Sequence, residues 1–281
     1  MAGTTEPTRD PSLEDLEIEL LLGGLSRHWG HDLRGYARPT LKRRVLGCVR
    51  AEGLSTVSGL QERVLHDPAA MARLVGAVTS GVGGLFRDPS LFLTLRRRVV
   101  PLLRTYPFVR VWHAGCSTGE DVYALAIVLA EEGLTTRVRT YATDVSEAVL
   151  ARAKAGVYVA SALAAAESRY ARAGGRRSLS DYVTVGPGGL TVAASLRDNV
   201  VFGQHNLATD RSFNEFNLVL CRDVLLHFSR ELQTNVLALL HESLCRLGVL
   251  GLGARESLRG SGHEDHFEAL DPDVRLFRRI G

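Results

Sequence analysis

The stretch HAGCSTGED, residues 113–121, decides the fold of the longer part of the chain. It follows the apolar run FVRVW and precedes VYALAIVLAEEG, whose apolar residues recur at helical spacing. We therefore predict a strand, a tight turn and a helix. Gly115 and Gly119 carry no Cβ, so the backbone can turn sharply there and a ligand can approach it closely. Such a turn lies at the carboxyl end of its strand, where open α/β sheets bind their ligands.

Around this turn, short apolar segments alternate with helical patterns. The expected strands are RVWHA, VRTYATD, VVFGQHN, FNLVLCRD, GVLGLG and RLFRRI, and the helices between them are DVYALAIVLAEEG, SEAVLARAKAG and RELQTNVLALLHESL. This alternation predicts an α/β fold with a parallel, doubly wound sheet. One segment, DYVTVGPGGLTVAAS, instead alternates apolar and polar residues around Gly-Pro-Gly-Gly. It predicts a small antiparallel β-subdomain at about residues 178–196.

Residues 13–88 show helical periodicity, so an all-α N-terminal domain is expected before the sheet. Apolar residues recur at helical spacing in SLEDLEIELLLGGLSRHWG, PTLKRRVLGCVRAEG, TVSGLQERVLHDP and AAMARLVGAVTSG. Pro39 marks one helix start, and glycines separate the segments. We place the boundary at residue 88, so that residues 89–281 form the sheet domain and begin with a helix over about 90–105.

Composition narrows the classes of function. The 281 residues, 45% of them hydrophobic, are enough for two domains. No apolar run reaches the roughly 18 residues of a membrane span, and the polar N-terminus is unlike a signal peptide. The four cysteines form no C-x-x-C pair, which disfavours disulfides and a metal site and fits the cytoplasm. A net charge of +3 is too small to indicate a nucleic-acid binder, because arginine clusters such as RPTLKRR usually form solvated helix faces.

The charged residues near the turn favour a nucleoside-type cofactor. Glu120 lies in the turn, and Asp144 ends the next expected strand, where an acidic residue typically hydrogen-bonds ribose hydroxyls. The glycine spacing is not G-x-G-x-x-G, and a carboxylate beside the glycines would repel a pyrophosphate. A cofactor with a ribose and a zwitterionic or cationic tail, such as S-adenosylmethionine, therefore fits better than NAD. A tight turn without a ligand is the alternative for the glycines alone.

Six motifs in the same order resemble those of the CheR-type chemoreceptor glutamate methyltransferases, over residues 13–280. AGCSTGED is similar to that family's AGCSTGEE, YATDVSEAVLARAKAGVY to its ATDID…LxxAxxGxY, FNLVLCRDVLLHF to its FDLIxCRNVLIYF, and GARESL to its GHSESL. In the helical part, GYARPTLKRRVLGCVRAEGL is similar to GYKxxxLxRRVxxRMxxxGL and TSGVGGLFRDPSLF to TTNxTxFFRDPxxF. The resemblance implies a Rossmann-like enzyme that transfers a methyl group from S-adenosylmethionine to receptor glutamates and releases S-adenosylhomocysteine.

The resemblance also implies roles for individual residues. Arg87 would approach the methionine carboxylate of the cofactor, Glu120 its amino group and Asp144 its ribose. Further cofactor contacts are expected from Gly115, Asn206, Leu207, Arg222 and Asp223. The last two would lie near the transferable methyl group, and the catalytic roles fall to Arg87, Arg222 and His227.

The partner implied by the resemblance is an acidic helical region of a chemoreceptor. Arg43, Arg44 and Arg50 would recognise it, and the β-subdomain would offer a docking surface. A glutamate carboxylate has a reference pKa of about 4.3, so it is already an anionic nucleophile at neutral pH. Its attack on a sulfonium methyl group needs alignment and removal of water rather than a general base. We expect a monomer that binds neither nucleic acid nor metal and does not insert into a membrane.

Four departures from the family pattern leave alternatives open. Gly81 and Gly83 replace an Asn and a Thr, which would weaken cofactor binding roughly tenfold or more through lost hydrogen bonds. Asp223 replaces an Asn and His227 a Tyr, although His227 could equally be a packed, neutral histidine. One alternative is a methyltransferase of the same fold with a different acceptor. Another is a degenerate module that only binds S-adenosylmethionine or its product. An RNA methyltransferase is disfavoured, because no RNA-binding module is recognisable.

Overall fold

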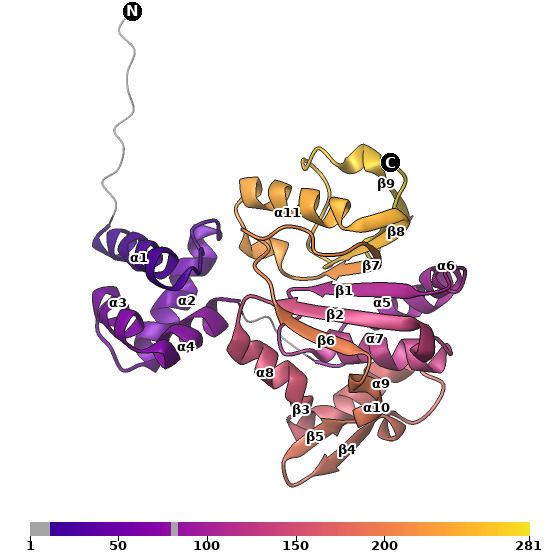
Figure 1. Ribbon diagram of the computed structural model, residues 1–281. Helices are drawn as coiled ribbons and strands as arrows, with labels where there is room; N and C mark the ends of the chain where they lie inside the picture. Colours follow the sequence, from indigo (N-terminus) through magenta and orange to yellow (C-terminus); the bar gives the residue numbers. More distant parts are fainter. Residues whose placement is uncertain (1–11, 80–83) are drawn as a thin grey trace, which may run out of the picture. The chain divides into compact units, whose positions relative to one another are not determined.

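The computed structural model describes residues 12–79 and 84–281, which belong to two compact units divided between Val78 and Thr79 (Figure 1). The boundary expected from the sequence was residue 88. The contacts place it earlier, because Leu85 and Phe86 are buried in the core of the second unit. The substituted glycines at positions 81 and 83 lie outside the described residues.

The first unit is helical, as predicted. Its helices are α1 Leu13–Gly24, with the π-helical turn η1 Leu25–Trp29, α2 Arg38–Ala51, α3 Val57–His66 and α4 Pro68–Thr79. Ser12 caps α1 by accepting the N–H of Asp15, and Thr56 caps α3 by accepting the N–H of Gly59. The apolar stripes bury Ile18, Leu21, Val45, Leu60 and Val64 against one another, which gives this unit a core of its own.

The second unit is built on a seven-stranded sheet in the order β6-β2-β1-β7-β8-β10-β9. These strands are β1 Val109–Ala114, β2 Val138–Asp144, β6 Val200–Gln204, β7 Phe216–Cys221, β8 Leu244–Leu252, β9 Phe267–Asp271 and β10 Leu276–Arg279. The pairs from β6 to β8 are parallel. Figure 1 shows α7 Glu120–Glu131 and α8 Glu147–Ala155 on one face of the sheet and α11 Arg230–Glu242 on the other. The predicted doubly wound fold is confirmed.

One edge of this sheet differs from the prediction of a wholly parallel sheet. The final strand β10 runs antiparallel to both β8 and β9, and β9 was not predicted. Only residues 272–275 connect β9 to β10, and a connection this short closes a hairpin rather than the long crossover that a parallel pair needs. The prediction of a parallel sheet is therefore wrong for β10, which runs antiparallel to β8, and the hairpin partner β9 is an addition to it.

The remaining elements surround this sheet. They are α5 Pro89–Thr94, the π-helical turn η2 Leu95–Val99, α6 Val100–Leu103, η3 Thr135–Arg137, η4 Ala160–Ala162, α9 Leu163–Arg172, η5 Leu179–Asp181, α10 Ala194–Arg197, η6 Leu225–His227 and η7 Glu264–His266. The predicted hairpin is confirmed as β4 Val183–Gly186 and β5 Gly189–Val192. Strand β3 Val157–Tyr158 joins it in a small antiparallel sheet of order β3-β5-β4.

Candidate functional site

The glycine turn lies between the end of β1 at Ala114 and the start of α7 at Glu120, as predicted. Gly115 and Gly119 have φ angles of +72° and +87°, which favour glycine. A Cβ on Gly115 would lie 2.5 Å from Cγ2 of Val224, in the loop after β7. A side chain at this position would therefore have to displace the neighbouring loop.

Asp144 ends β2 beside this turn and is buried. Its Oδ2 accepts the N–H of Ser117 and its Oδ1 the N–H of Ser146, each at 3.0 Å. Burial raises the pKa of the Asp144 carboxyl, although these backbone hydrogen bonds act in the opposite direction. A carboxylate offers about four lone-pair sites. The backbone N–H of Val145 also interacts with the carboxylate, and lone pairs remain for a further donor.

Two predicted arginines lie in a cluster of charges next to the turn, which we call the Arg–Asp cluster. It consists of Arg87, Arg222, Asp88, Asp121 and Asp223. Arg222 forms ion pairs with Asp88 and Asp121, while Arg87 pairs with Asp223 and approaches Asp88 at 3.9 Å. The Arg222 side chain is only 5% exposed, so its guanidinium is committed to the two aspartates. Arg222 thus ties the segment before α5 and the start of α7 to the loop after β7.

Glu256 fixes the loop that carries Asp223, a role that was not expected from the sequence. Its Oε2 accepts the N–H of Asp223 at 3.0 Å and that of Gly253 at 2.6 Å, while Oε1 accepts the N–H of Leu226 at 3.3 Å. Asp223 has a φ of +58°, a conformation that Asn and Asp adopt more readily than most residues. The motif GARESL contained Glu256, but only the structure shows what the carboxylate holds. Asp88 and Asp121 were missed as well.

The other predicted cofactor contacts lie along the same edge of the sheet. Glu120 accepts a hydrogen bond from the hydroxyl of Thr118 at 2.6 Å. The turn containing Asn206 and Leu207 follows β6, and the N–H of His205 donates to the carbonyl of Asp144 at 3.1 Å. The carboxyl ends of β1, β2, β6 and β7 therefore bring the predicted cofactor residues into one region.

Two further side chains frame this region. The hydroxyl of Tyr158, on β3, donates to the carbonyl of Thr118 at 2.8 Å, so the small sheet contacts the glycine turn directly. His227 is buried in η6, within the loop that follows β7. The loop after β7 thus carries Arg222, Asp223 and His227 in a single short segment.

The predicted receptor-binding arginines lie on α2 in the first unit, and the structure separates them into two kinds. Arg43 and Arg50 are exposed and lie two helical turns apart on one side of the helix. Arg44 is half-buried and donates a hydrogen bond to the carbonyl of Val78, and burial lowers its pKa. Arg44 therefore links α2 to α4, whereas Arg43 and Arg50 are available to a partner.

His113 is a buried histidine on β1, one residue before the strand ends. Its Nε2 has no hydrogen-bond partner among the described residues. Burial, and secondarily the positive charge of Arg222, lower the pKa of His113 to about 3. The imidazole is therefore neutral at physiological pH and adds no charge to the Arg–Asp cluster.

We expect His113 to make the fold sensitive to acid. Between about pH 6.5 and pH 3 the unfolded chain binds a proton at this histidine and the folded protein does not, so stability falls as the pH falls. At pH 5 the loss from His113 is about 2 kcal/mol relative to neutral pH. Urea unfolding of the parent and of His113→Leu at pH 7.5 and pH 5 measures this loss, which the variant should lack. An equal loss in both proteins would contradict the assignment.

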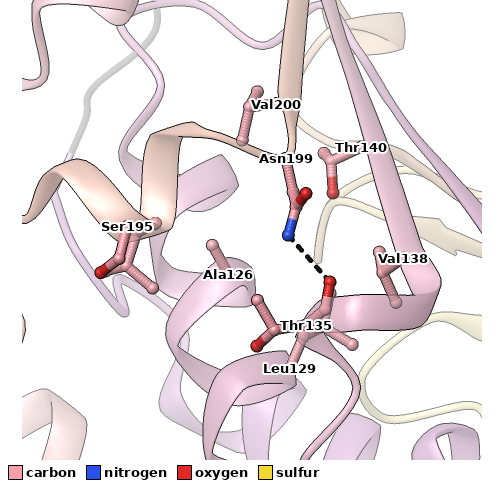
Figure 2. Close-up of a pocket in the computed structure, with 9 residues that line it drawn as sticks. Ala126, Leu129, Thr135, Val138, Thr140, Ser195, Asn199 and Val200 are labelled. Carbon is pink, nitrogen blue, oxygen red and sulfur yellow. Dashed lines mark hydrogen bonds between the residues drawn. The ribbon is translucent and has the colours of Figure 1, made fainter.

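A separate pocket lies at the opposite end of β2, where β2 and β6 begin (Figure 2). Its lining is mostly apolar and comprises Ala126, Leu129, Thr135, Val138, Thr140, Ser195, Leu196, Asn199 and Val200. The amide of Asn199 donates to the carbonyl of Thr135 at 2.8 Å. None of these nine described lining residues is titratable, so they offer none of the chemistry of the glycine-turn region.

No group of three or more His, Cys, Asp or Glu side chains within residues 12–79 and 84–281 is placed to hold a metal ion. Of the helices in these same ranges, none combines the length and the apolar character needed to cross a membrane.

Comparison with known proteins gave matches over both units. Residues 16–79 match the family described as CheR methyltransferase, all-alpha domain, and residues 82–275 match CheR methyltransferase, SAM binding domain. The Pseudomonas putida protein Cher3 is 48% identical over 265 residues, which cover 94% of this chain and 97% of Cher3. Chemotaxis protein methyltransferase 1 of Pseudomonas aeruginosa is 29% identical over 270 residues, covering 92% of this chain and 96% of that protein. A SAM-dependent methyltransferase from Geobacter sulfurreducens in complex with S-adenosyl-L-homocysteine gives a TM-score of 0.34 at 16% identity, covering 65% of this chain and 54% of that one.

Proposed function

Because the chain belongs to the CheR methyltransferase family, we propose that it transfers a methyl group from S-adenosylmethionine to glutamate carboxylates of a chemoreceptor. Family membership makes it an S-adenosylmethionine-dependent methyltransferase of the chemotaxis type, and the glutamate acceptor is the proposed part. The observation that supports the proposal most is the meeting of the glycine turn, Asp144 and Arg87 at one edge of the sheet.

The residues at this edge fit the cofactor. Asp144 has lone pairs left for the ribose hydroxyls, and the glycine turn allows close approach of the backbone. Arg87 offers a cation for the methionine carboxylate, and Glu120 an anion for the amino group. When bound, S-adenosylmethionine supplies a methyl group on a positively charged sulfur.

The chain's own contribution to the reaction is orientation and exclusion of water. The acceptor carboxylate is ionised at neutral pH, so the protein has no proton to remove from it. Arg222 is buried in ion pairs, and we assign it the role of a positioning residue for the loop after β7. His227 follows in the same loop and is our candidate for contact with the reacting groups.

A methyl-transfer assay with a panel of acceptors tests the proposal. The panel comprises an acidic helical receptor fragment, the same fragment with its glutamates changed to glutamine, and small carboxylic acids. We expect methyl transfer only to the acidic receptor fragment that keeps its glutamates. Transfer to a small acid would favour a methyltransferase of the same fold with a different acceptor. The substitutions at Asp223 and His227 make this the second candidate function. Cofactor binding with no transfer to any acceptor would favour a degenerate binding module.

Arg43 and Arg50 are expected to attract the acidic receptor helix. Replacing both with alanine should lower the rate of receptor methylation about tenfold at low salt, because complementary charge mainly speeds association. The parent rate should also fall with salt, since a Debye length of about 10 Å at 0.1 M screens exposed charges. The affinity for S-adenosylhomocysteine should stay level in calorimetry.

Arg38→Ala is the matched control for this pair of substitutions. Arg38 is an exposed arginine on the same helix, but it is already paired with Glu19. Its replacement should leave the methylation rate close to that of the parent. A methylation rate that is independent of salt, or an unchanged rate in the Arg43/Arg50 variant, would count against this role.

A further inference from the structure

Asp223 forms an ion pair with Arg87, the arginine that the proposed function assigns to the methionine carboxylate of the cofactor. The Arg87 guanidinium is ion-paired with the Asp223 carboxylate. The side chains are 26% and 21% exposed, so solvent screens the pair only in part. The backbone of Asp223 is held in place by the buried Glu256, which accepts its N–H. The carboxylate is therefore presented to Arg87 by a fixed loop and not by a flexible tether.

The charge balance of the Arg–Asp cluster also disfavours a further carboxylate next to Arg87. Its two arginines face three aspartates, which gives a formal charge of −1 before any ligand arrives. A ligand carboxylate adds one more anion next to Arg87. Arg87 must then leave Asp223 for the ligand or hold two carboxylates close together, and both outcomes cost free energy. An Asn at position 223, as in the family pattern CRN, would leave the cluster neutral and Arg87 without this anionic partner.

We propose that Asp223 acts as an internal competitor for Arg87. Binding of a ligand that carries an amino-acid moiety then requires exchange of the Asp223 carboxylate for the ligand carboxylate. A ligand with the same nucleoside but no carboxylate is not subject to this competition. The inference rests on the proposed function, because it takes Arg87 as the residue that meets the methionine carboxylate.

The test compares two ligands on matched variants by calorimetry. S-adenosylhomocysteine carries the carboxylate, and 5′-methylthioadenosine has the same nucleoside and thioether without the amino-acid part. Asp223→Asn should bind S-adenosylhomocysteine about tenfold more tightly than the parent and methylthioadenosine within twofold of it. Asp121→Asn removes the same charge from the cluster but leaves the Arg87–Asp223 pair intact, so its gain should be less than threefold.

Asp223→Gly provides a second variant that suits the positive φ at this position, and thermal melting checks that each variant folds. An Asp223→Asn protein that binds S-adenosylhomocysteine no better than the parent would overturn the competition. So would an equal gain for methylthioadenosine, or an equal gain in Asp121→Asn. Binding of neither ligand by any of the proteins would instead refute the proposed cofactor site, and the competition with it.

Discussion

Replacing Asp144 with alanine is expected to weaken S-adenosylhomocysteine binding at least a hundredfold. In the proposed function the carboxylate has two tasks, because we expect it to accept the ribose hydroxyls and it also accepts the N–H groups of Ser117 and Ser146. Hydrogen bonds to a charged group contribute about 1.5–3 kcal/mol each, so loss of the ribose contacts alone accounts for a hundredfold change. Isothermal calorimetry measures the effect directly.

Two controls separate the tasks of Asp144. Asp144→Asn keeps one acceptor oxygen and should retain part of the affinity. Asp198→Ala removes an exposed aspartate at the other end of the sheet, near the start of β6, and should bind like the parent. If Asp144→Ala bound S-adenosylhomocysteine as tightly as the parent, the ribose would have to lie elsewhere.

Replacing Glu256 with alanine is expected to lower the free energy of unfolding by about 3–5 kcal/mol. The substitution leaves the N–H groups of Gly253, Asp223 and Leu226 without their buried acceptor, and each carries a desolvation cost of about 1–3 kcal/mol. The loop with Asp223 should loosen at the same time, so cofactor affinity should fall as well. Urea unfolding followed by circular dichroism measures the stability.

Glu256→Gln is the informative partner of this variant. It keeps the size and one acceptor oxygen but turns an amide N–H₂ toward a backbone donor. Its free energy of unfolding should therefore lie between those of the parent and Glu256→Ala. Glu167→Ala, at an exposed position of α9, should change stability by less than about 0.5 kcal/mol. A stability of Glu256→Ala within 1 kcal/mol of the parent would show that water replaces the carboxylate.

The parts of this fold that the sequence predicted are those with a local periodic signal. Strand β2 was expected at residues 138–144 and is found there, because its apolar run ends in a polar residue at a turn. The turn glycines were equally visible, since each must adopt a conformation that favours glycine. Strand β9 was missed because FEALD is a short, half-buried segment at an edge and has no clear alternation.

The partners within the candidate site could not be predicted in the same way. Arg222 meets Asp88 and Asp121 across 134 and 101 residues of chain, and no local pattern records which charges will pair over such distances. The arginines of α2 show a related limit. Their clustering is plain in the sequence, but only burial distinguishes Arg44, which holds two helices together, from its exposed neighbours.

The long reach of the Arg–Asp cluster also orders events during biosynthesis. A chain that emerges from the ribosome presents the glycine turn and Asp144 early, when Arg222 and Glu256 have not yet been translated. The loop after β7, which contains Arg222, and its acceptor Glu256 are therefore added only when most of the polypeptide exists. We therefore expect the ability to bind the cofactor to be gained only late in synthesis, after Glu256 has been translated.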